Sequence, residues 1–243
     1  MYQLSKEHGG TGGQSIPPYD DFDEKGIITV EPPNKPVIML SPFRNDPDAA
    51  PLRTPSGKIE LFSETIDSFG YDNCPGHPTW MEPSEWLGSA NRKSDQYHLI
   101  SNQPTPRLHS QFDCGKISRR HKVKQREPLR MNPEDAASNG ISDGDTVVVY
   151  NDRGSFYATT VFDKRISVGV LQIATGAWFD PQQLDVDKSP CKHGNPNLVT
   201  HDRGTSRLAQ GPAAMSCLVR IEKASAPAPE VTAFLSPNIC PAK

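Results

Sequence analysis

The chain has 243 residues, with 26 Lys and Arg against 29 Asp and Glu and a formal net charge of -3. This balance leaves no broad basic face for a nucleic-acid backbone. Hydrophobic residues make up only 35%, and 24 prolines and 18 glycines punctuate the chain, which favours short strands over long helices and excludes a membrane span of roughly 20 apolar residues.

The first part of the chain is polar and rich in Gly and Pro, as in "HGGTGGQSIPPYDDFDEKG". Such a sequence cannot bury enough apolar surface to fold alone, so we expect loops of a larger body, partly disordered. Residues 58–62 alternate polar and apolar side chains and predict a strand. "WMEPSEWLG" predicts at most a short helical turn, with Trp80 and Trp86 as packing residues.

Regular structure is predicted from Tyr97 onward. "YHLISNQP" reads as a short strand that stops at Asn102. In "MNPEDAASNGI", Asn132 is placed to cap a brief helix, Pro133 fits its first position, and the dipeptide ending in Gly140 supplies a left-handed stop.

Further strands are predicted over residues 146–150 and 155–162, joined by the tight turn "NDRG", and again in "VGVLQIATGAW" and "AMSCLVRIEK". The tail "ASAPAPEVTAFLSPNICPAK" is predicted to be extended. Residues 97–223 therefore read as an all-β domain with a small helix. Because strands are well formed at both its start and its end, a closed barrel is expected.

Polar loops accompany these strands: "SNQPTPRLHSQ", "NDRG", "ATGAWFDP" and "HGNPNLVTHDRGTSRLAQGP". Loops at one end of a barrel are where binding sites are normally built. The candidate binding residues are Asn102, Gln103, Arg107, His109, Ser110, Gln111, Asp152, Arg153, Trp178, Asn195, Asn197, Thr200, Thr205, Ser206 and Gln210.

These residue types suit a large, planar, phosphate-bearing cofactor. Amides pair with the edge of a fused heterocycle, and Arg107 and Arg153 can fork onto phosphate. Asp152 can accept two N–H bonds from a guanine-type edge, and Trp178 can stack on a flat ring. The alternative is that Asn, Asp, Ser and Thr stabilise their own turns, which leaves the Gln, Arg and Trp residues unexplained.

The sequence contains no recognisable catalytic or metal-binding motif. The five cysteines lack any C-x-x-C pair, so neither a disulfide framework nor a zinc site is suggested. The chain has no nucleophile elbow and no phosphate-binding glycine motif after a strand, and we assign no catalytic and no metal-ligating residue. The basic run "KISRRHKVKQR" reads as a solvated loop or, alternatively, a phosphate-facing loop.

Five collinear motifs carry a resemblance: "TPSGKIELFSETIDSFGYDNCPGHPTW", "LISNQPTPRLHSQ", "REPLRMNPEDAASNGISDGDTVVVYNDRG", "GAWFDP" and "HGNPNLVTHDRGTSRLAQGP". Together they resemble the C-terminal portion of molybdopterin oxidoreductases of the dimethyl sulfoxide reductase family, most of all the biotin sulfoxide and trimethylamine N-oxide reductases. The resemblance implies a mainly β fold, a double-psi β-barrel of the aspartate-decarboxylase-like type with short helices. It implies an upstream catalytic tail over residues 1–94, the barrel over 95–224 and a Pro-rich tail over 225–243.

The resemblance also implies a bis(molybdopterin guanine dinucleotide) molybdenum cofactor that the barrel caps. Carried onto this chain, the candidate residues line that cofactor, with Asn197 and Gln210 as pterin contacts and Asp152 as a guanine partner. The cofactor is expected to be shared with missing N-terminal catalytic domains, in the same or a separate chain. The intact enzyme transfers an oxygen atom from an S-oxide or N-oxide, and the isolated chain is expected to be inactive.

Two other functions remain open. The barrel could be a non-enzymatic binding or assembly module, or a small enzyme of the aspartate-decarboxylase type that self-cleaves at the Gly–Ser pair Gly154-Ser155. No nucleic-acid partner is expected. The compartment is left open, with the cytoplasm favoured over the periplasm, and the electron donor, substrate and oligomeric state are not predicted.

Overall fold

The computed structural model divides into two compact units, Met1–Phe62 and Ser63–Lys243. It describes residues 17–28, 35–36, 38–213, 215–224 and 227–236. The first unit contains the short helices α2 (Tyr19–Lys25) and α3 (Ser41–Asn45), neither of which buries a residue. The boundary between these units follows Phe62, whereas the resemblance places the start of the barrel domain at residue 95.

The strand predicted over residues 58–62 is wrong, since these residues form no strand. Ile59 and Leu61 are 67% and 82% exposed, so the apolar side of the alternation has no surface to pack on. Trp80 is 75% exposed and is not a packing residue, whereas Trp86 is half-buried. Alternation predicts a strand only where a partner strand exists, and no described residue supplies one here.

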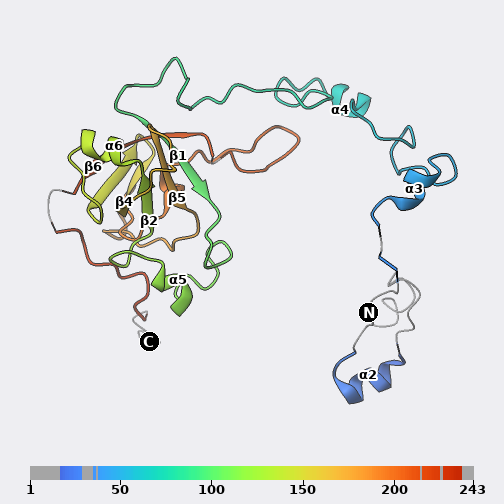
Figure 1. Cartoon of the computed structure of the whole chain (residues 1–243), viewed down its shortest axis with the longest axis horizontal. Coiled ribbons are helices and arrows are strands. Elements are labelled where there is room, and N and C mark those ends of the chain that lie inside the picture. The colour runs from blue at the N-terminus through green and yellow to red at the C-terminus, as the bar shows by residue number, and fades with distance from the viewer. Residues whose placement is uncertain (1–16, 29–34, 37, 214, 225–226, 237–243) are drawn as a thin grey trace. The chain divides into compact units, whose positions relative to one another are not determined.

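The second unit holds a six-stranded barrel. Its elements are α4 (Glu64–Asp67), β1 (Tyr97–Asn102), α5 (Lys116–Arg120), β2 (Pro128–Met131), α6 (Pro133–Ser138), β3 (Thr146–Asn151), β4 (Gly154–Phe162), β5 (Val170–Ala174), the 3-10 helix η1 (Pro196–Leu198) and β6 (Cys217–Lys223). The strands close in the order β1-β5-β2-β4-β3-β6 (Figure 1). None of the helices in the described part of the chain is long and apolar enough to cross a membrane.

The strand pairing has internal two-fold symmetry. The pairs β1–β5 and β2–β4 are parallel, and the other four pairs are antiparallel. Exchanging β1 with β4, β2 with β5 and β3 with β6 interchanges the two parallel pairs, interchanges β1–β6 with β3–β4, and leaves β2–β5 and β3–β6 unchanged. Two interlocked, equivalent halves of this kind make a double-psi β-barrel, and the predicted fold class is confirmed.

The barrel interior is filled by alternate residues of each strand. Leu99, Val149, Phe156 and Ile173 are fully buried, as the period of two requires. In the last strand, Cys217 and two further alternate positions are buried in the same way. Each large apolar side chain buried in this way stabilises the fold by roughly 1.5–3 kcal/mol.

Helix α6 begins and ends where its sequence predicts. The Asn132 side chain accepts a hydrogen bond from the Glu134 N–H at 2.9 Å, with Pro133 in the first position. Gly140 has the left-handed φ of 64°, and Ile141 folds back so that its N–H donates to the Ala136 carbonyl at 2.9 Å. The capping residues therefore fixed this element locally.

Strand β2 is missing from the sequence prediction. It has only four residues, and only Leu129 and Met131 face the core. A pattern of two alternations after a proline is too short to distinguish from a loop. The strand forms because β4 and β5 pair with its two edges.

Strand direction decides where the connections lie. Strands β1, β3 and β5 run one way along the barrel, and β2, β4 and β6 run the other way. The connections 103–127, 152–153 and 175–216 therefore all lie at one end, which we call the loop end. Helix α6 and the connection 163–169 lie at the opposite end, in agreement with the positions of α5 and α6 in Figure 1.

Candidate functional site

The predicted binding residues all belong to the loop end of the barrel. Asn102 is the last residue of β1, and all the others lie in the three connections defined above. The expectation that the polar loops gather at one end of the barrel thus agrees with the strand topology. Asn102 and Trp178 each donate to a backbone carbonyl of the connection 103–127, and the other thirteen side chains divide into three groups by what they contact.

In the first group, the polar side chain is exposed and makes no hydrogen bond to another residue that the structure describes. These residues are Gln103, His109, Ser110, Gln111, Asp152 and Asn197. They offer amide, imidazole, hydroxyl and carboxylate groups from three separate connections. A turn-stabilising role does not account for these side chains, because each would need a bond to its own backbone for that role.

The backbone beneath part of this group is fixed by a close approach of two connections. A Cβ on Gly176, whose φ is 87°, would lie 2.0 Å from the His109 carbonyl oxygen, so only glycine fits there. The Trp178 Nε1–H donates to the Ser110 carbonyl at 2.9 Å, and the Thr175 N–H donates to the Asn102 carbonyl at 2.9 Å. The segments that follow β1 and β5 are therefore held side by side, with the Trp178 ring 38% exposed.

The second group contains the two arginines, and both bind protein groups rather than facing solvent. The guanidinium of Arg107 donates to the Glu127 carboxylate at 3.2 Å, the Ser118 hydroxyl at 3.2 Å and two backbone carbonyls. Its side chain is only 1% exposed. The prediction that Arg107 forks onto phosphate is not supported by this arrangement, because four of its five N–H groups already donate to protein acceptors.

Arg107 is one of four charged residues that we call the buried ion cluster, together with Asp113, Lys122 and Glu127. The Lys122 ammonium lies 2.7 Å from Asp113 and 2.6 Å from Glu127, and no side chain of the cluster is more than 5% exposed. Burial would raise the pKa of Asp113, but the hydrogen bond and charge of Lys122, with the charge of Arg107, outweigh it and lower that pKa. Two cations and two carboxylates thus balance inside the fold.

Arg153 is held in a second network, in which Glu85 is the acceptor. The two terminal guanidinium nitrogens of Arg153 donate to the Glu85 carboxylate at 2.7 and 2.9 Å, and its Nε–H donates to the Val199 carbonyl at 2.6 Å. Glu85 also accepts the Leu218 N–H at 2.7 Å. Partial burial opposes ionisation of Glu85, yet the Arg153 and Leu218 bonds lower its pKa to about 2. Arg153 therefore joins three segments and is not free to fork onto phosphate.

Replacing Glu85 with glutamine is expected to lower the free energy of unfolding by about 1–2 kcal/mol, since one charge-assisted fork is lost in a partly exposed setting. Urea unfolding followed by circular dichroism measures the change. The matched control is Glu222→Gln, whose exposed side chain makes no hydrogen bond to a described residue. Equal urea midpoints for the two variants would contradict the inference that the Glu85 hydrogen bonds to Arg153 and Leu218 stabilise the fold.

The third group stabilises its own turns. Asn195 caps η1 by accepting the Asn197 N–H at 3.0 Å, and the Thr200 hydroxyl donates to the Asn197 carbonyl at 3.4 Å. Thr205, Ser206 and Gln210 lie in a hairpin closed by the bridge between residues 204 and 212. There the Gln210 amide donates to the Ser206 carbonyl at 3.2 Å, so the expected pterin contact has its donor directed into its own loop.

A buried histidine at this end escaped the sequence prediction. His193 is fully buried, its Nδ1–H donates to the Trp178 carbonyl at 3.1 Å, and its Nε2 has no partner among the described residues. Burial, followed by the nearby Lys122 charge, lowers the pKa of His193 to about 4. A single loop histidine without ligand spacing gave no signal in the sequence.

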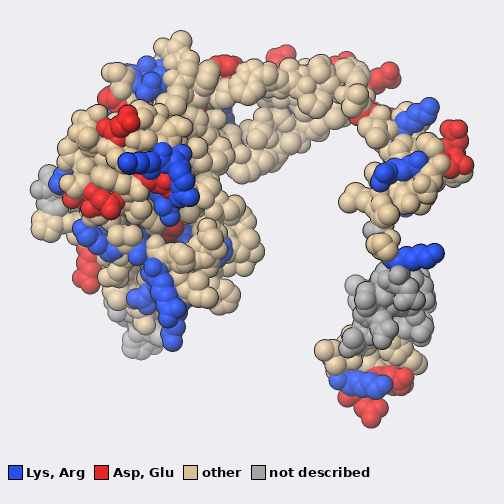
Figure 2. All heavy atoms as spheres, viewed as in Figure 1, with Lys and Arg blue, Asp and Glu red and all other residues tan. Residues whose placement is uncertain are grey.

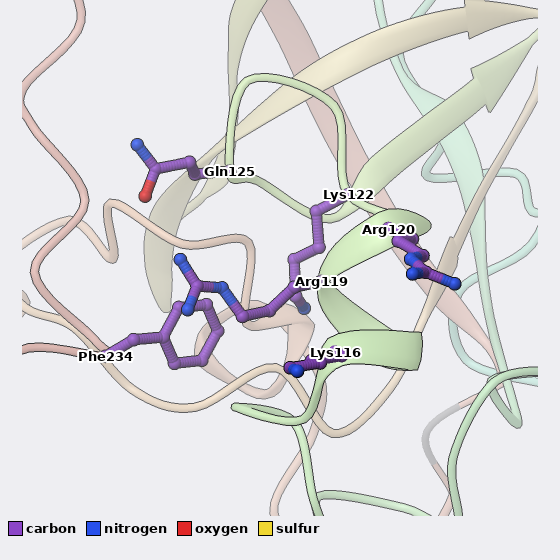
Figure 3. Close-up of a pocket in the computed structure, with 6 residues that line it drawn as sticks. All are labelled: Lys116, Arg119, Arg120, Lys122, Gln125 and Phe234. Carbon is purple, nitrogen blue, oxygen red and sulfur yellow. The ribbon is translucent and has the colours of Figure 1, made fainter.

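A basic hollow lies beside α5, in the run that the sequence left open as a solvated or a phosphate-facing loop. The cavity, of about 470 Å³, is lined by Lys116, Arg119, Arg120, Lys122, Gln125 and Phe234 (Figure 3). The first five residues of the run form the helix α5, and residues 121–126 form a turn closed by the bridge between Val123 and Arg126. Within the part of the chain that the structure describes, no three His, Cys, Asp or Glu side chains are grouped to hold a metal ion.

Comparison with known proteins identifies similar sequences. Residues 97–218 match the family model described as "Molydopterin dinucleotide binding domain". The chain is 38% identical over 239 residues to the dimethyl sulfoxide/trimethylamine N-oxide reductase of Rhodobacter capsulatus, which covers 98% of this chain and 29% of that protein. It is 40% identical over 223 residues to the biotin sulfoxide reductase of Cereibacter sphaeroides, with 91% and 29% covered.

The trimethylamine-N-oxide reductase of Haemophilus influenzae is 43% identical over 204 residues, covering 83% of this chain and 24% of that protein. The chain thus spans less than a third of the length of these curated relatives. Among solved structures, the acetylene hydratase from Pelobacter acetylenicus superposes with a TM-score of 0.59 at 22% identity, over 74% of this chain and 25% of that one. At this identity the likeness concerns the fold alone.

Proposed function

The chain belongs to the family of molybdopterin dinucleotide-binding domains, and we propose that it holds the guanine form of this cofactor within a molybdenum-dependent S-oxide or N-oxide reductase. One observation supports the proposal most directly. Six exposed polar side chains without hydrogen-bond partners among the described residues come from three connections that lie at one end of the barrel. Such a set is available to a ligand that spans several loops.

The donors and acceptors of this set fit the proposed cofactor. The amides of Gln103, Gln111 and Asn197 can each donate and accept on one planar group, as the edge of a pterin requires. The Asp152 carboxylate has only acceptors, which suits the two neighbouring N–H groups of guanine. When bound, the molybdenum cofactor supplies the oxygen-atom transfer chemistry, and these residues bind and orient it.

Variants of the free side chains test the proposal. The double variant Asp152→Ala/Asn197→Ala is expected to retain about tenfold less pterin than the wild-type chain, because it loses one charged and one neutral hydrogen-bonding group. The chain is purified from a host that makes the cofactor, and the fluorescence of the oxidised pterin is measured per chain. Mass spectrometry of the released nucleotide identifies the base.

Gln210→Ala is the informative comparison in this experiment. The sequence-based prediction includes Gln210, whereas its amide is bonded within its own hairpin, so we expect unchanged pterin content. A folded wild-type chain without any pterin would contradict the proposal and favour a non-enzymatic barrel module. A released nucleotide other than guanine would contradict the guanine form alone.

The oxygen-transfer activity is proposed for a larger assembly. Because the relatives are more than three times longer than this chain, we propose that further catalytic domains, in the same or a separate polypeptide, complete the cofactor site. The purified chain alone is then expected to reduce neither trimethylamine N-oxide nor dimethyl sulfoxide with a reduced viologen dye. Turnover by the chain alone, followed by dye oxidation, would contradict this expectation.

A further inference from the structure

We propose that the cavity between α5 and Phe234 is an oxyanion site that takes a diphosphate group. The proposal starts from the charges that line it. Lys116, Arg119 and Arg120 are exposed, and none forms an ion pair with a carboxylate in the described part of the chain. Figure 2 shows Lys and Arg side chains gathered over α5 without interleaved acidic residues.

The fourth cation of the cavity does not add to this free charge. The Lys122 ammonium lies 2.7 and 2.6 Å from the carboxylates of Asp113 and Glu127 and is only 2% exposed. The buried ion cluster behind the cavity is thus neutral as a whole. The three cations on α5 therefore face the cavity and the solvent uncompensated.

The opposite wall of the cavity is fixed by the C-terminal segment. The Phe234 ring packs edge-on against His193, with ring centroids 4.8 Å apart. Two residues earlier, the backbone N–H and hydroxyl of Thr232 donate to the Asp180 carboxylate at 2.7 and 2.6 Å. The Arg119 guanidinium lies 5.3 Å from the centre of the Phe234 ring, which positions this cation at the cavity (Figure 3).

The lining chemistry selects the ligand class. A guanidinium forks onto two phosphate oxygens, a lysine ammonium binds as a point charge, and the Gln125 amide adds a neutral donor. Among the described residues, no carboxylate lines the cavity. Its volume of about 470 Å³ leaves room for more than one tetrahedral anion, so two linked phosphates match its charge and its size better than one.

Calorimetric titration of the whole 243-residue chain with inorganic pyrophosphate, in low-chloride buffer, tests the site. The double variant Lys116→Gln/Arg119→Gln is expected to bind at least about tenfold more weakly, because two of the three free cations are removed. The matched control is Lys164→Gln, an exposed lysine in the connection 163–169 at the other end of the barrel. Circular dichroism checks that all variants keep the wild-type fold.

No detectable binding by the wild-type chain up to about 10 mM pyrophosphate would overturn the proposal. Equal affinity of the double variant and the wild type, or an equal loss in Lys164→Gln, would also overturn it. The proposal does not need the cofactor assignment. A chain that retains no pterin but still binds pyrophosphate would refute the proposed function and leave this site standing.

Two further titrations identify the molecule that carries the diphosphate. If the pterin-free chain binds pyrophosphate and the chain loaded with pterin dinucleotide does not bind it, the site holds the diphosphate of the cofactor. If both bind pyrophosphate equally and guanosine diphosphate competes, the site serves a free nucleoside diphosphate. Either result supports the oxyanion site, and the two differ only in the molecule that carries the phosphates.

Discussion

Replacing Asp113 with alanine is expected to destabilise the second unit by about 3–5 kcal/mol, because removing one member of a buried charge network leaves unpaired charge inside the fold. Lys122 and Arg107 would then share the single carboxylate of Glu127. The Asp113 side chain is fully buried. It also accepts hydrogen bonds from the Ser118 hydroxyl and the Trp178 N–H, both at 3.0 Å.

Urea unfolding at pH 7, followed by circular dichroism, measures this loss. Asp113→Asn separates the two contributions, because it keeps hydrogen-bonding atoms for Ser118 and Trp178 while removing the negative charge, and we expect a loss smaller than that of alanine. The control is Asp202→Ala, an exposed residue without a hydrogen bond to a described side chain. A change below about 1 kcal/mol for Asp113→Ala, the range of exposed ion pairs, would contradict a structural role for the cluster.

The lowered pKa of Asp113 also fixes the sign of its pH dependence. A carboxyl group whose pKa is lower in the folded chain than in the unfolded chain stabilises the fold fully above the unfolded value of about 3.9. This stabilisation is lost as the pH falls through the folded value. The cluster is therefore expected to contribute acid sensitivity only below about pH 4.

Local signals in the sequence were sufficient for much of the barrel. The cap at Asn132, the left-handed Gly140 and the alternation in β3, β4 and β6 depend on residues a few positions apart, and all appear in the structure. The double-psi topology was predicted from family resemblance rather than from these signals. Strand β2 shows the limit of local patterns, because its four residues are strand only by virtue of the neighbours on both edges.

The candidate site was predictable in position but not in detail. That the loops share one end follows from strand order, yet the same arginine can bind a ligand phosphate or a protein carboxylate. Arg153 is paired with Glu85, 68 residues away in sequence, and Arg107 with Glu127, 20 residues away. Neither pairing has a spacing signal, so composition alone assigned both guanidiniums to the ligand.

Lowering the pH from about 6.5 to about 4 is expected to reduce the free energy of unfolding by about 3 kcal/mol through His193 alone, at 1.36 kcal/mol per unit of pKa difference. The unfolded chain protonates this imidazole below about pH 6.5, whereas burial and the Lys122 charge keep it neutral in the fold down to about 4. Between these values the unfolded state binds more protons, so stability falls as the pH falls. Above pH 6.5 the residue adds no pH dependence.

The variant His193→Gln keeps an N–H donor for the Trp178 carbonyl and removes the titration of this residue, so its unfolding free energy should fall by about 3 kcal/mol less than that of the wild type across this window. His121→Gln, an exposed histidine at the end of α5, should retain the wild-type slope. Because Asp113 acts only below about pH 4, the two buried groups are separable by pH alone. A His193→Gln slope equal to that of the wild type would mean that the imidazole becomes protonated within the fold, and that its Nε2 reaches solvent despite its burial.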